Sequence, residues 1–192
     1  VRHAVPGAPP ALASALAAGP LPAVLALLSD PDHHVRKAAV QALSGAAHAA
    51  PALARPHLPT ALPALHALTA VDESLVRVVT VGPFTHRVDD GLDLRKAAFE
   101  AIDVLLDGLP PDALDMPAFM AALRAGLADH VDVKLPCLLT LGRVAAAAPG
   151  AVLPELDALA PLLDAVVTAT VKSTAVKQEI DRNDDLVRAA LR

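Results

Sequence analysis

Aromatic residues are nearly absent from this sequence, which has three Phe and no Trp or Tyr among its 192 residues. A hydrophobic core must therefore be built from Leu, Val and Ala, whose side chains each bury little area. At about 25 cal/mol per Å² of buried apolar surface, stability then depends on many small contacts stacked on one another.

Positive charge is also in short supply. Lys and Arg number 16 against 21 Asp and Glu, so the net charge is −5 with His neutral. A general nucleic-acid surface needs a basic stripe and preferably aromatic rings that stack on bases. The sequence has neither, which argues against a nucleic-acid partner.

Cysteine occurs once, at Cys137. A single Cys excludes an intrachain disulfide and a zinc site built on cysteines. Because Cys137 falls on the apolar face of a predicted helix, we expect a buried structural thiol.

The beginning of the chain lacks charge, with no charged residue from Ala4 to Ser29. Prolines interrupt this stretch, however, and only Arg2 and His3 precede it, so neither a membrane span nor a signal peptide is favoured. We expect residues 1–20 to be a poorly ordered Ala- and Pro-rich leader. The missing Met at the start, and a helical pattern that is still running at the last residue, suggest a chain truncated at both ends.

One helical pattern recurs along the chain. Each copy has small or apolar residues spaced as on one face of a helix, a basic residue in second place, and an Asp just upstream that we expect to cap the helix. The copies begin at Val35, Leu94, Val133 and Val187. The basic residues Arg36, Arg95, Lys134 and Arg188 are expected on the outer rim. Recurrence at roughly 40- to 60-residue spacing indicates a helical repeat array. The motif D-x-x-V-R-x-A-A resembles the second helix of a HEAT repeat, so we predict an all-α HEAT-repeat α-solenoid.

The helical period stops at about residues 75–88. Leu75–Val81 is rich in β-branched residues and Phe84–Val88 alternates, with Gly82-Pro83 between them. This predicts a β-hairpin inserted between the two helices of one repeat. Pro83 does not suit the second central position of a two-residue type I′ turn, so we expect a longer loop. Since a two-stranded ribbon is marginal alone, the hairpin is either a docking element or packs back on the helices.

Three local expectations follow from the same patterns. A helix should begin at Leu94, and residues 171–185 should form a polar connection to the last helix. Pro136 should lie in or near a first turn, or bend its helix, because proline lacks the N–H that a helix interior uses.

Catalytic and metal-binding patterns are missing. His33 and His34 are adjacent and therefore cannot form the i, i+4 pair of a zinc helix, and the cluster of Asp89, Asp90 and Asp93 lacks the spacing of a calcium loop. No phosphate-binding glycine loop or nucleophile elbow occurs. We therefore expect no enzyme, no metal, no cofactor and no small-molecule substrate, with surface or capping roles for most histidines and a contact role for His86.

The segment GPFTHRVDDGLDLRKAAFE, residues 82–100, resembles the C-terminal TIP120 region of the cullin-associated, neddylation-dissociated protein family. The stretches 126–132 and 176–185 agree with the same family. The resemblance assigns residues 21–192 to a C-terminal TIP120-like HEAT-repeat region.

The resemblance implies a non-catalytic protein of the cytoplasm and nucleus that binds the cullin of a cullin–RING ubiquitin ligase together with its RING subunit. It would compete with the substrate-receptor adaptor and promote receptor exchange, with no membrane partner. The hairpin contacts that it implies are Arg77, Val79, Val81, Pro83, Phe84 and His86. Alternation would put Val79 with Val81, and Phe84 with His86, on one face of each strand. The alternative is a HEAT-repeat scaffold for another protein, such as a transport cargo or a phosphatase subunit.

Overall fold

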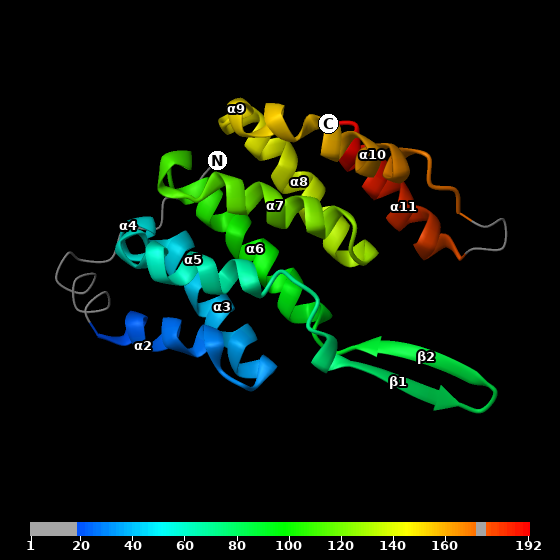
Figure 1. Cartoon of the computed structure of the whole chain (residues 1–192), viewed down its shortest axis with the longest axis horizontal. Coiled ribbons are helices and arrows are strands. Elements are labelled where there is room, and N and C mark those ends of the chain that lie inside the picture. Colours follow the sequence, from blue (N-terminus) through cyan, green and yellow to red (C-terminus); the bar gives the residue numbers. More distant parts are fainter. Residues whose placement is uncertain (1–18, 172–175) are drawn as a thin grey trace. The chain divides into compact units, whose positions relative to one another are not determined.

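The computed structural model describes residues 19–171 and 176–192, and the chain folds into helices with one two-stranded sheet (Figure 1). It divides into two compact units, the first ending at Asp115 and the second comprising Met116–Arg192. The expected leader lies almost entirely outside the described residues. None of the described helices has both the length and the apolarity that a membrane span requires.

The first unit is built around the contact between two long helices. Its helices are α2 (Pro20–Ala26), α3 (His33–Ala49), α4 (Pro51–Ala54), α5 (Leu58–Ala67) and α6 (Leu92–Gly108). Helices α3 and α6 lie against each other, with Val40 and Leu43 facing a core shared with Ala98 and Ile102, all fully buried. Small residues on α6 allow this close approach, as the sequence pattern predicted.

The second unit places its longest helix between two others. Its helices are α7 (Met116–Leu127), α8 (Val131–Ala147), α9 (Pro149–Val152), α10 (Leu156–Val167) and α11 (Lys177–Ala190). Helix α8 contacts both α7 and α11. The expected buried thiol is confirmed, because Cys137 is fully buried on α8, and this burial raises the pKa of the thiol.

The two units repeat one order of local structure. Helices α3 and α8 start at residues 33 and 131, an offset of 98 residues (131 − 33), and their last residues, 49 and 147, keep that offset. The starts of α5 and α10, at Leu58 and Leu156, obey it too. So do three pairs of prolines: Pro51 and Pro149, Pro56 and Pro154, and Pro63 and Pro161. The chain is a HEAT-repeat solenoid, as predicted.

The two units differ in the connection that follows α5 in the first unit and α10 in the second. In the first unit, residues 68–91 separate α5 from α6 and contain the two strands, whereas residues 168–176 alone separate α10 from α11. The hairpin is therefore an insertion in one of two similar modules. This agrees with the expectation that it interrupts a repeat.

Several boundaries differ from those predicted. Helix α6 begins at Leu92 instead of Leu94, and α11 begins at Lys177, so residues 177–185 are helical and not a polar connection. Of that expected connection, residues 172–175 lie outside the description. The prediction was wrong because a helix that buries few residues has a mostly polar sequence, like a connection. Helix α11 buries only Leu186 and Ala189.

Pro136 was expected in or near the first turn or at a bend; it lies just beyond the first turn of α8, and the helix continues past it. Proline removes one intrahelical hydrogen bond, but Val133 and Cys137 on either side of it are buried. These two residues are four apart and share one face of α8, and the packing of that face stabilises a helix that the proline weakens.

The cap and core expectations are met only in part. Asp32 caps α3, its Oδ1 accepting the His34 N–H at 2.7 Å. Asp93 instead lies within the first turn of α6 and pairs with Lys37 of α3 at 2.8 Å. Val35 is half-buried, so its position lies at the edge of the core that Leu43 and Val40 occupy.

Candidate partner-binding hairpin

The hairpin consists of β1 (Val76–Val81) and β2 (Phe84–Asp89), which pair antiparallel from Val76 opposite Asp89 to Val81 opposite Phe84. Directly opposed residues belong to the same face of such a ribbon. We call one set of register positions the Phe84 face: Arg77, Val79, Val81, Phe84, His86 and Val88. The opposite set is the Val78 face: Val76, Val78, Thr80, Thr85, Arg87 and Asp89. Alternation along each strand predicted that Val79 and Val81 share a face and that Phe84 and His86 share a face. The register shows that these two pairs lie on the same face of the hairpin. Five of the six implied contact residues belong to it, Val81 by its register position only, because its side chain is not described.

The turn of the hairpin is shorter than expected. Gly82 and Pro83 alone connect the paired residues Val81 and Phe84, so the expectation of a longer loop is wrong. Gly82 has φ +61°, the left-handed value that the first central residue of a type II′ turn requires. The second central residue of that turn has negative φ, which the proline ring imposes. The error came from considering only the type I′ turn.

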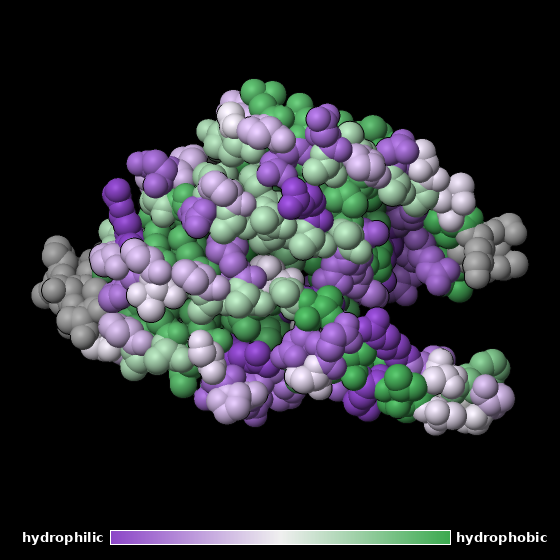
Figure 2. Space-filling model, viewed as in Figure 1, coloured by the Kyte–Doolittle hydropathy of each residue, from purple (hydrophilic) through white to green (hydrophobic). Residues whose placement is uncertain are grey.

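The outer part of the hairpin is open to solvent. Phe84 is 67% exposed on one face and Val78 is 69% exposed on the other. Pro83 and His86 are also exposed, whereas Val79 and Val88 are half-buried. Figure 1 shows the ribbon extending beyond the helices of its unit, and Figure 2 shows apolar surface along it with polar surface at its base. The strands therefore do not pack back on the helices.

A buried arginine holds the base of the hairpin. The Arg95 side chain, on α6, is only 2% exposed, and its Nη2 donates to Asp89 Oδ2 at 2.8 Å. The hydrogen bond and charge of Arg95, with the Gly91 N–H, hold the pKa of the Asp89 carboxyl below its usual value. This corrects the expectation that Arg95 lies on the outer rim. It joins the end of β2 to the core helix.

Close backbone packing tightens the same junction. The Asp90 N–H donates to the Leu75 carbonyl at 3.0 Å, across the two ends of the hairpin. A Cβ added to Gly91 would lie 3.2 Å from Leu75 Cδ1 and 3.3 Å from Asp89 Oδ1. A side chain here would press on Leu75 and Asp89, so the backbone packs closely where the hairpin returns to α6.

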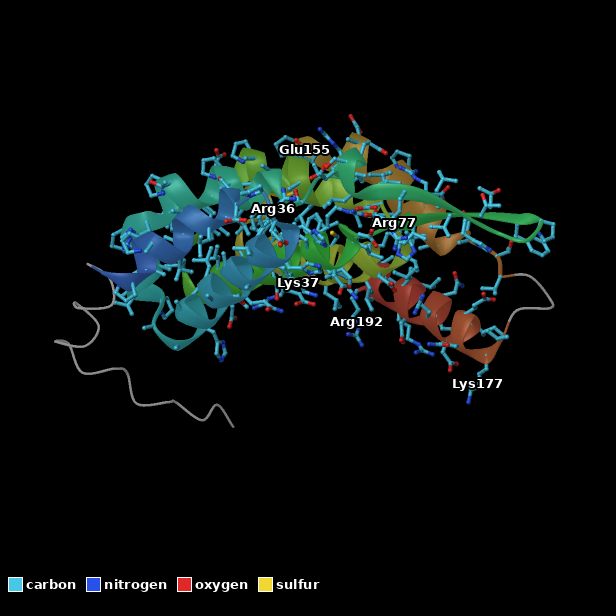
Figure 3. The ribbon with its side chains drawn as sticks, turned by 90° about the horizontal axis from the view of Figure 1, so that it is seen from below. Arg36, Lys37, Arg77, Glu155, Lys177 and Arg192 are labelled. Carbon is cyan, nitrogen blue, oxygen red and sulfur yellow. The ribbon has the colours of Figure 1, made fainter. Side chains whose placement is uncertain are left out.

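Exposed ion pairs surround this buried junction. Arg77 donates to both oxygens of Asp90, at 2.7 and 3.3 Å, and holds the pKa of that carboxyl below its usual value. On the other face, Arg87 contacts both oxygens of Glu73 at 3.0 and 2.9 Å. Arg77 was an implied partner contact, and the structure shows its guanidinium engaged within the hairpin base. Figure 3 labels it on the hairpin.

A link from α3 reaches the strand leading into the hairpin. Arg36 Nη2 lies 3.4 Å from Asp72 Oδ2, and Asp72 caps the 3-10 turn Glu73–Leu75 by accepting the Ser74 N–H. Figure 3 labels Arg36 and Lys37, both on α3. Helices α3 and α6 therefore both contact the base of the hairpin.

The aspartates of the hairpin exit have structural partners. Asp89, Asp90 and Asp93 pair with Arg95, Arg77 and Lys37 respectively. Each carboxylate of this cluster is thus engaged by a cation of the same unit.

The structure also brings together three ligand-type side chains that sequence reasoning set aside. Potential ligand atoms of Asp32, His33 and His34 lie within 4.8 Å of one another at the start of α3. Reasoning from i, i+4 spacing missed this group because it considered only pairs on one helix face. The combination of a capping Asp with two following histidines was the available signal.

Comparison with known protein families gives two matches. The family model described as "TATA-binding protein interacting (TIP20)", named TIP120, matches residues 53–192. The HEAT-repeat model matches residues 21–47.

Curated relatives carry names of one kind. The chain is 46% identical over 168 residues to Cullin-associated NEDD8-dissociated protein 1 of Arabidopsis thaliana, covering 88% of this chain and 14% of the relative. It is 45% identical to the protein of the same name from Drosophila melanogaster, covering 86% of this chain and 13% of the relative. A relative from Emericella nidulans named as the C-terminal part of such a protein is 34% identical, with 90% and 16% covered. The chain therefore spans about one seventh of the length of these relatives.

Among solved structures, the crystal structure of an engineered protein aligns with a TM-score of 0.53 and 18% sequence identity. The alignment covers 95% of this chain and 67% of that one. At this identity the likeness concerns the fold alone.

Proposed function

Because the chain belongs to the TIP120 family, we propose that it is a non-catalytic protein that binds a cullin through its hairpin. The relatives named above are called cullin-associated, and the chain matches a small share of their length. In this proposal the protein engages a cullin with its RING subunit, in the cytoplasm and nucleus. It occupies the surface used by the substrate-receptor adaptor, and so promotes exchange of receptors.

One observation supports the hairpin as the working element. Of the three Phe residues, Phe99 and Phe119 are 1% exposed in the cores of the two units, whereas Phe84 is 67% exposed. Aromatic side chains, Phe among them, are enriched at the cores of protein interfaces. In so aromatic-poor a chain, an exposed Phe on a projecting ribbon is the natural anchor for a partner.

The fixed base supports the same proposal. Binding by a flexible segment loses free energy because side chains and backbone must be ordered. Here Arg95 and Arg77 already hold the hairpin ends by ion pairs at 2.8 and 2.7 Å. These contacts order the base of the ribbon before the partner arrives, which lowers the ordering cost of binding through the Phe84 face. We propose that this face, and not the Val78 face, contacts the cullin.

A deletion tests whether the hairpin acts at all. Residues 77–88 are replaced by a short Gly/Ser linker, which can close because Val76 and Asp89 are directly paired. Helical circular dichroism should be nearly unchanged, since each repeat of a solenoid depends mainly on its neighbours. Release of adaptor from a purified cullin–RING–adaptor complex should fall to the rate without added protein. A folded deletion variant that still releases adaptor at the parent rate would exclude this function for the hairpin.

Two point variants test which face is used. Phe84→Ala and Val78→Ala each truncate one similarly exposed apolar side chain, one on each face of the same ribbon. Loss of an aromatic anchor typically costs about 2 kcal/mol or more, so Phe84→Ala should weaken binding to the cullin about 30-fold. Val78→Ala should change it less than threefold. A larger loss of binding for Val78→Ala than for Phe84→Ala would assign the contact to the Val78 face. A pulldown that recovered another protein and no cullin would favour the general scaffold alternative.

A further inference from the structure

The start of α3 holds a side-chain group that the proposed function does not use. Asp32, His33 and His34 bring a carboxylate oxygen and two imidazole nitrogens within 4.8 Å of one another. We propose that these three residues bind a divalent transition-metal ion, with Zn²⁺ as the representative case. The site is independent of cullin binding, so either proposal can fail alone.

Local geometry explains why consecutive residues converge. Asp32 is extended at φ −82° and ψ 120° as the helix cap, and its Oδ1 accepts the His34 N–H at 2.7 Å. This hydrogen bond turns the carboxylate back over the first turn, where His33 Nδ1 lies 4.0 Å from Oδ1. The two imidazole rings have centroids 3.9 Å apart, tilted by 38°. Adjacent residues on a helix point in different directions, yet here the rings of His33 and His34 lie side by side.

The ligand set suits the proposed ion. Two imidazoles and one carboxylate are the protein ligands of many catalytic zinc sites, with water in the fourth position. Zn–N and Zn–O distances of about 2.1 Å require ligand atoms closer than those seen here. Side-chain rotation can supply this, because Asp32 and His34 are exposed and His33 is only half-buried. The contacts to Asp32 described above use Oδ1, so Oδ2 can face the ion.

A shallow cleft beside the group gives room for water ligands. It has a volume of ≈ 280 Å³ and is lined by His33 and His34 together with Asp89, Asp90 and Asp93. These three aspartates are already paired with cations, so they are not ligands in this proposal. The end of a helix where the N–H groups point outward disfavours a cation, and Lys37 lines the same cleft. We therefore expect reversible binding, weaker than that of a structural zinc site.

The experiment titrates the full chain with Zn²⁺ at pH 7.5 by calorimetry, and with Co²⁺ by visible absorption, which reports nitrogen and oxygen ligation. One ion per chain is expected. His33→Ala/His34→Ala should abolish binding or weaken it at least tenfold. Asp32→Asn keeps the helix cap, because Asn caps as well as Asp, and removes the anionic ligand, so it should also weaken binding without loss of helical signal.

His130→Ala is the matched control. His130 caps α8 and contacts Asp132, so it is an exposed histidine beside an aspartate at the corresponding place in the second unit. Its removal should leave the affinity within twofold. The proposal is overturned if the chain shows no saturable binding, or if binding survives His33→Ala/His34→Ala in a folded protein. It is equally overturned if His130→Ala removes the binding instead.

Discussion

Two arginines at the base of the hairpin allow a direct test of how burial changes the contribution of an ion pair to the free energy of unfolding. Arg95 is 2% exposed and faces Asp89, which is 25% exposed, whereas Arg77 and Asp90 are 60% and 38% exposed. Breaking a buried pair by removing one partner costs about 3–5 kcal/mol because the remaining charge is left unpaired. An exposed pair contributes about 0.2–1 kcal/mol. Since Asp89 keeps some contact with water, we expect about 3 kcal/mol for Arg95→Met and about 0.5 kcal/mol for Arg77→Met.

Methionine keeps most of the arginine volume, so the comparison isolates charge from cavity formation. Urea denaturation followed by circular dichroism measures both variants. Hydrogen exchange of the hairpin amides shows whether the loss is local or global. The double variant Arg95→Met/Asp89→Asn should recover part of the loss, because it leaves no unpaired charge. Equal losses for Arg95→Met and Arg77→Met, or a loss below about 1 kcal/mol for Arg95→Met, would refute the reasoning from burial.

Other predictions rest on single features of the structure. Leu94→Asp should lower the free energy of unfolding by several kcal/mol, because Leu94 is 4% exposed and the new charge would be unpaired, and an unchanged melting temperature would show that the helix register is wrong. Cys137 should react with a thiol reagent only as fast as the protein unfolds, since burial raises its pKa, and rapid labelling of the native chain would contradict its placement. Gly82→Ala should cost about 1–2 kcal/mol at the hairpin tip, where φ is +61°, and should speed hydrogen exchange of β1 and β2 alone. The lowered pKa of Asp89 stabilises the fold above its unfolded pKa of about 3.9, so stability should fall as the pH drops below about 4, less steeply in Asp89→Asn.

Helices and strands could be predicted from the sequence where buried residues recur at a regular spacing. The pattern that begins at Leu94 predicted the buried face of α6, including Ile102 and Leu105, because every third or fourth residue must face the core. The hairpin was readable for the corresponding reason, since β-branched residues with alternation follow a period of two. Both strands lie within a residue of their expected limits.

The errors arose where tertiary packing outweighs a local rule. Pro136 breaks the helix rule, yet α8 continues past it because Val133 and Cys137, which share one face of the helix, are buried. The position of Arg95 in the repeat predicts an exposed rim, but Arg95 is buried and the end of the hairpin supplies Asp89 as its partner. The periodicity of α6 does not contain that information, because the partner Asp89 comes from an insertion. The grouping of Asp32 with His33 and His34 depends likewise on a cap geometry that spacing rules do not describe.

The internal repeat explains how a hairpin can be inserted without weakening the solenoid. The second unit joins α10 to α11 through residues 168–176, where the first unit uses residues 68–91. A helix pair of this kind therefore folds without a hairpin, and only the base of the insertion has to meet the requirements of the core. Arg95 and Gly91 meet them, by ion pairing and by close approach to Leu75. Exposed positions near the tip, such as Phe84, make no such contact with the core, so their side chains are available for the contact proposed above.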